Sequence, residues 1–63
     1  MNNAALYRNK GVVMEKMAAF SVYLDEGMTA VERMYPQHIG FVRDHEGKTM
    51  AQVKKELLQA LPA

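Results

Sequence analysis

The chain has 63 residues, no cysteine and a formal net charge of +1 from eight basic and seven acidic side chains. This length allows one small domain over residues 1–63, and the lack of cysteine excludes disulfides and thiolate zinc sites. Hydrophobic residues make up 49% of the chain, and a domain this small buries only about 60% of its unfolded surface. We therefore expect a homodimer that covers the remaining apolar surface.

No segment is long and apolar enough to suggest a membrane span. The longest apolar-leaning stretch, residues 17–24, falls short of the roughly 20 residues that a spanning helix needs. The first residues also lack the basic start and apolar run of a secretory signal. These features predict a cytoplasmic protein without membrane contact.

The first segment of the chain is predicted to form a helix. Four apolar side chains recur there at spacings of four, three and four residues: Val13, Met17, Phe20 and Leu24. Asn2 or Asn3 is the expected N-cap. Gly11 costs about 1 kcal/mol inside a helix, so the regular helix is expected to begin near Val12. Residues 20–25 also alternate apolar and polar side chains, which leaves open an α+β fold with a short hairpin around residues 20–34.

Two short helices are predicted in the middle of the chain. Thr29 and Glu32 have the spacing of a capping box, with Thr29 as the N-cap of the first short helix. Pro36 disfavours helical geometry at Tyr35 but suits the first turn of a helix, so a second helix is expected from Pro36 to about Asp44. A strand over residues 39–42 is the alternative.

The middle segment is also the expected contact surface for a partner protein. Methionine is flexible and polarizable and recurs at adaptable binding surfaces, and this segment has little chain left to cover it. The candidate contact residues are Met28, Val31, Met34, Tyr35 and Phe41.

The last helix is predicted over residues 50–61. Thr49 and Gln52 form a second capping-box pattern, and Pro62 ends the helix. Its apolar side chains lie at three- and four-residue spacing: Met50, Val53, Leu57, Ala60 and Leu61. Together with the first helix, this stripe is expected to build a core or interface that two subunits share. The residues assigned to it are Val13, Met17, Phe20, Leu24, Val53, Leu57 and Leu61.

Few residue patterns suggest catalysis, metal binding or nucleotide binding. His38 and His45 are seven residues apart and have no third fixed ligand, so two exposed histidines in a polar turn are the preferred interpretation. Gly47–Thr49 resembles the end of a phosphate-binding loop, but Val42 stands where that motif requires a glycine. We therefore expect no catalytic residues, no metal and no cofactor.

Nucleic-acid binding is the alternative function. Short helices joined at Tyr35–Pro36 are compatible with a helix-turn-helix regulator. The phosphate contacts would be Arg33, Arg43, Lys48, Lys54 and Lys55. A net charge near zero and the scattered basic residues do not favour this function.

Residues 30–33, followed by Pro36 and His38, resemble a stretch in the theta subunit of bacterial replicative DNA polymerase III. That family consists of helical accessory proteins that bind the proofreading subunit. The likeness is confined to residues 30–38, and no functional residue is carried over from it.

The sequence as a whole predicts an all-α domain of three or four helices, packed or intertwined as a homodimer. Its expected role is that of a non-enzymatic protein–protein interaction module, an adaptor or inhibitor that acts on a larger protein complex.

Overall fold

The computed structural model describes the backbone of residues 3–60 and the side chains of residues 10–60. Within that range the chain forms four α-helices and one 3-10 turn, with no strand. The prediction of an all-α domain is therefore confirmed, and the alternatives of a hairpin around residues 20–34 and a strand over residues 39–42 are wrong. The expected N-caps Asn2 and Asn3, and also Leu61 and Pro62, lie outside the residues or side chains described. The last helix was expected to reach residue 61, but it ends at Gln59 with Ala60 as its C-cap.

The first helix, α1 (Asn3–Glu26), is the longest one described, and the other three α-helices pack against it. It begins well before Val12, where regular helix was expected to start, because the good helix formers before Gly11 offset the unfavourable glycine. It ends at Gly27, whose φ of 93° is a conformation that L side chains rarely adopt. The amide of Gly27 donates the last helical hydrogen bond to the Tyr23 carbonyl at 2.9 Å.

The second helix starts earlier than predicted, directly after Gly27. The helix α2 (Met28–Met34) follows Gly27 directly, and no side chain caps it. Thr29 thus lies inside the first turn and is not the N-cap that its spacing to Glu32 predicted. The chain leaves α2 at Tyr35, whose amide donates to the Val31 carbonyl at 2.7 Å.

The predicted helix from Pro36 to Asp44 consists of two parts. A 3-10 turn, η1 (Pro36–His38), leads into the helix α3 (Ile39–Asp44). Proline suits this first turn because it has no amide hydrogen to leave unpaired. A tight turn with a φ of 87° at Gly47 then connects α3 to the last helix.

The last helix, α4 (Met50–Gln59), confirms the capping-box prediction. Thr49 Oγ1 accepts a hydrogen bond from the Gln52 amide at 3.1 Å, and Gln52 Oε1 accepts one from the Thr49 amide at 2.8 Å. Two amides at the start of the helix are thereby satisfied.

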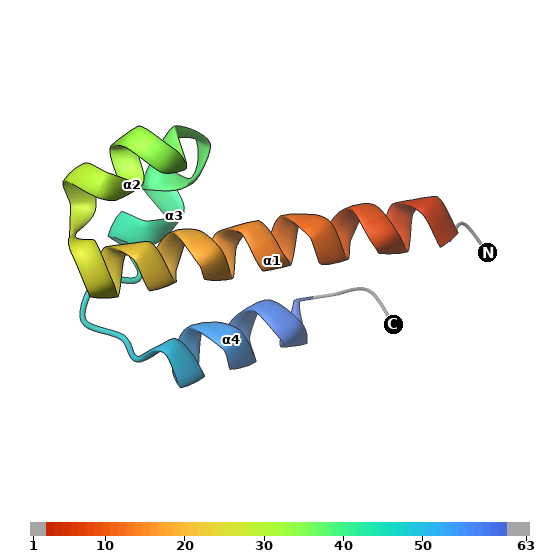
Figure 1. Ribbon diagram of the computed structural model, residues 1–63. Helices are drawn as coiled ribbons and strands as arrows, with labels where there is room; N and C mark the ends of the chain where they lie inside the picture. The colour runs from red at the N-terminus through yellow and green to blue at the C-terminus, as the bar shows by residue number, and fades with distance from the viewer. Residues whose placement is uncertain (1–2, 61–63) are drawn as a thin grey trace.

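The short helices pack around α1. In Figure 1, α2 and α3 lie on one side of the C-terminal half of α1, and α4 runs back along the other side toward the N-terminus. The buried cluster draws on all four helices: Val13, Ala19, Phe20, Val31, Val42, Val53 and Leu57. Each helix thus contributes to one core, and the molecule is elongated along α1, with principal extents of 39, 22 and 16 Å.

Candidate functional site

The residues of the predicted contact surface in the middle segment differ in how far they are buried. Val31 is 0% exposed and belongs to the core, because α2 turns this side toward α1. It therefore does not lie on the surface expected to meet a partner. Met28, Tyr35 and Phe41 are partly buried against the core. Met34, at the end of α2, is 53% exposed and is the accessible apolar side chain of this set.

The two predicted apolar stripes lie mostly inside one chain. Val13, Phe20, Val53 and Leu57 are all less than 10% exposed, and Met17 packs against them. Leu24 differs, since half of it remains exposed at the C-terminal end of α1.

Met14 is an exposed apolar residue that the sequence pattern did not single out. It lies outside the predicted stripe of Val13, Met17, Phe20 and Leu24, and 66% of it is exposed. Met14 follows Val13 by one residue, and successive residues of a helix point about 100° apart. That rotation takes Met14 away from the core that Val13 enters.

His38 occupies a buried position that the sequence did not indicate. Only 8% of it is exposed, and its Nε2 lies 3.1 Å from Oε2 of Glu15 on α1. Because a carboxylate oxygen accepts, Nε2 carries the hydrogen in this bond. The prediction of two exposed histidines in a polar turn is therefore wrong for His38, and the side chain of His45 is also mostly covered, with 17% of it exposed. The 3-10 turn after Tyr35 points this side chain toward α1, a tertiary contact that the local sequence does not encode.

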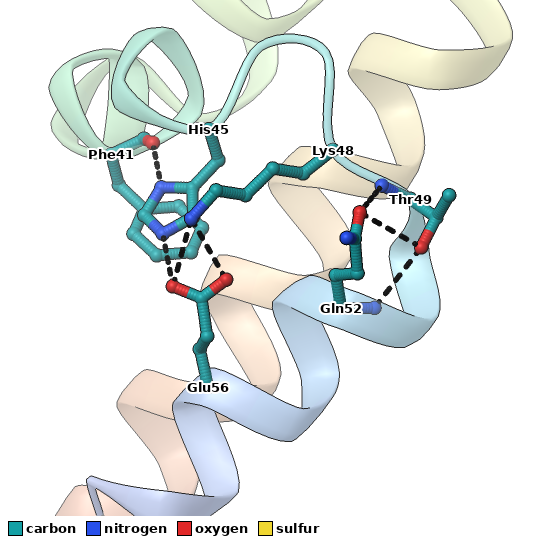
Figure 2. A network of polar contacts seen from close by, with 6 residues as sticks. All are labelled: Phe41, His45, Lys48, Thr49, Gln52 and Glu56. Atoms are coloured by element: carbon teal, nitrogen blue, oxygen red, sulfur yellow. Dashed lines mark hydrogen bonds and ion pairs between the residues drawn. The ribbon is translucent and has the colours of Figure 1, made fainter.

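His45 lies in a second polar cluster, where α3 meets α4 (Figure 2). Its Nδ1 donates to the Phe41 carbonyl at 2.7 Å, and its ring stacks on the Phe41 ring with centroids 4.2 Å apart. On the other side, Nε2 lies 3.7 Å from Glu56 Oε1, which is longer than a hydrogen bond. The ammonium of Lys16 lies 5.2 Å from the centroid of the Phe41 ring, within range of a cation–π contact.

Lys48 completes this cluster by holding Glu56. Its Nζ donates to both carboxylate oxygens of Glu56, at 2.9 and 3.0 Å. The hydrogen bond from Lys48 lowers the pKa of Glu56 below its ordinary value of 4.5, and the positive charge of Lys48 acts in the same direction. Lys48 and Thr49 thus both bond to residues of α4, so the segment after Gly47 shows the chemistry of helix capping.

The titratable groups are distributed over separate contacts. His38 pairs with Glu15 on α1, whereas His45 lies beside Glu56 on α4. Among the residues that the structure describes, no group of three or more His, Asp or Glu side chains is placed to hold a metal ion. Two of the five basic residues considered for nucleic-acid binding pair with carboxylates of the chain, Arg43 with Glu32 at 3.5 Å and Lys48 with Glu56.

The fold and these contacts define a small all-α domain with its own core and with apolar side chains left on its surface. The chain gives no significant match to a protein-family model, a curated protein or a solved structure. In the described part of the chain, no helix has both the length and the apolar character needed to cross a membrane.

Proposed function

We propose that this chain is a non-enzymatic protein–protein interaction module that self-associates and contacts a further protein through the end of α2. In this role it acts as an adaptor or inhibitor of a larger complex. The observation that carries the proposal is the set of large apolar side chains left exposed around a core that is already formed: Val12, Met14, Leu24, Met34 and Leu58. Exposed large apolar side chains are candidate contact points for a partner, and these five are distributed over α1, α2 and α4.

Met34 is the residue on which the partner contact depends. It is 53% exposed at the last position of α2, next to the partly buried Tyr35. The chain changes direction here, because Pro36 begins the 3-10 turn. A flexible thioether beside an aromatic ring suits a partner surface that is apolar and not strictly shaped.

The distribution of polar groups supports a binding role over a catalytic one. Both histidines contact a carboxylate or a carbonyl of the same chain. Each polar cluster also joins two segments of the fold, His38 with Glu15 across η1 and α1, and Lys48 with Glu56 across the loop before α4 and α4 itself. These groups stabilise the fold. This is what we expect of polar groups in a protein whose function is to present a contact surface.

A substitution at Met34 tests the partner contact. The tagged chain is used to capture proteins from its source cells, with Met34→Lys as the test variant and Gln37→Lys as the control. Lysine matches methionine in helix propensity, and Gln37 is exposed on the neighbouring turn. We expect a protein that the parent chain and Gln37→Lys enrich and that Met34→Lys loses, at unchanged helix content by circular dichroism. Equal enrichment by both variants would contradict this assignment.

A further inference from the structure

We infer that the outer side of α1 pairs with α1 of a second copy of this chain, antiparallel, about a twofold axis beside Ala18. The inference rests on the proposed self-association and adds to it the surface and the orientation. The residues that form the proposed contact stripe are Met14, Met17, Ser21 and Leu24.

The contact stripe has the geometry of a two-helix interface. Its members recur at spacings of three, four and three residues, which keeps them on one side of a helix. Met14 is 66% and Leu24 is 50% exposed. Met17 and Ser21 between them are half-buried. This side of α1 therefore presents two large apolar side chains that the chain's own core leaves uncovered.

Small residues next to the contact stripe allow a second helix to approach closely. Gly11 and Ala18 lie beside it, seven residues apart. A glycine inside a helix lowers its stability relative to alanine. Among the described residues nothing explains the missing side chain at Gly11, since an added Cβ would meet none of their atoms within 4 Å. The close approach of another backbone is a reason for glycine at such a position.

The charges along α1 favour a second copy in the antiparallel direction. Lys10 lies eight residues before Ala18, while Asp25 and Glu26 lie seven and eight residues after it, and all three are exposed. An antiparallel pair about Ala18 places Lys10 of one copy level with the end of the partner's α1, where the partner's Asp25 lies about 60° around the helix from the side that carries Lys10. A parallel pair would place like charges side by side, which is unfavourable.

The acidic end of α1 is itself unfavourable within a single chain. The negative end of a helix dipole destabilises carboxylates in the last turn, where Asp25 and Glu26 lie, and the first turn of α1 carries no acid. A lysine supplied by the partner offsets this arrangement. The same register brings Met14 near the partner's Leu24, with an axial offset of about 3 Å, which is two residues of helix rise.

Cross-linking at the proposed axis tests the inference directly. Because the chain has no cysteine, a single introduced thiol is the one reactive site. Ala18→Cys places two thiols next to each other across the axis. Lys55→Cys is the control, exposed on α4. With a short bis-maleimide, we expect Ala18→Cys to give covalent dimer at protein concentrations where Lys55→Cys remains monomeric. Equal yields from the two variants would overturn the inference.

Charge exchange gives a second readout that does not depend on a reagent. We expect Lys10→Glu to raise the dimer dissociation constant about tenfold, since two symmetric attractions become repulsions. Adding Asp25→Lys should restore most of the loss. A parent chain that is monomeric would remove the proposed self-association as well. A parent dimer that Lys10→Glu leaves unchanged would overturn the α1 pairing alone.

Discussion

Glu15 and His38 join the long helix to the turn between the two short helices. His38 is 8% exposed, and its Nε2 donates to Glu15 Oε2 at 3.1 Å across 23 residues of sequence. Glu15 itself is open to solvent, with 56% of its side chain exposed. This contact therefore gives a hydrogen-bond partner to His38, the one buried polar residue in the described part of the chain.

Removing the acceptor at position 15 is expected to destabilise the fold. Glu15→Ala should lower the free energy of unfolding by about 1 kcal/mol, because the buried imidazole loses its hydrogen-bond partner. Glu15→Gln keeps an acceptor oxygen and should lose less. Urea unfolding at neutral pH measures both differences. An unchanged midpoint for Glu15→Ala would show that the bond does not stabilise the packing of η1 on α1.

The two capping-box patterns should respond differently to the same substitution. Thr49→Ala should cost about 1 kcal/mol, because Thr49 Oγ1 accepts the bond from the Gln52 amide. Thr29→Ala should be close to neutral, since no side chain caps α2. Thermal unfolding of the two variants side by side makes the comparison. A cost at Thr29 equal to that at Thr49 would place the start of α2 two residues later than the structure has it, at Ala30.

The contrast between Val31 and Met34 can be measured in the same way. Val31→Ala should cost about 2 kcal/mol, from lost apolar burial and the cavity left behind. Met34→Ala should stay within about 0.5 kcal/mol, because the side chain is half exposed. Urea unfolding of both variants measures the difference. Equal costs would mean that Met34 packs more tightly than its exposure indicates.

The pair between Lys48 and Glu56 should make part of the stability depend on pH. The folded-state pKa of Glu56 is lowered by the bond from Lys48, so its contribution is present above the ordinary value of 4.5. It is lost as the pH falls through the lower, folded-state pKa. The difference in stability between the parent chain and Glu56→Gln should therefore shrink below pH 4.5, and Glu46→Gln serves as the control. Urea unfolding at several pH values checks this, and a gap that widens on acidification would contradict it.

Sequence patterns located the helices well where the signal was local. Thr49 and Gln52 bond to each other within one turn, so their spacing was enough to place the start of α4. The same spacing at Thr29 and Glu32 gave a wrong prediction, because Thr29 does not cap α2. There the boundary depends on Gly27, whose positive φ ends α1 and lets α2 begin at once. The spacing of a capping motif therefore does not by itself locate the start of a helix. The backbone conformation at the end of the preceding helix also decides it, and composition does not specify that conformation.

The candidate sites were harder to predict because burial depends on contacts between distant segments. Val31 and Met34 are three residues apart on one short helix, yet only Val31 reaches the core. Their spacing places these two residues on the same side of the helix. Only the packing of α2 on α1 decides that Val31 is buried and Met34 is exposed. His38 shows the same limit, since its partner Glu15 lies 23 residues away.

Self-association is the central claim, and light scattering across a dilution series tests it most directly. We predict a particle with twice the mass of the chain at micromolar concentration, which dissociates on dilution. A monomer with full helix content and a cooperative melt at every concentration would contradict the claim.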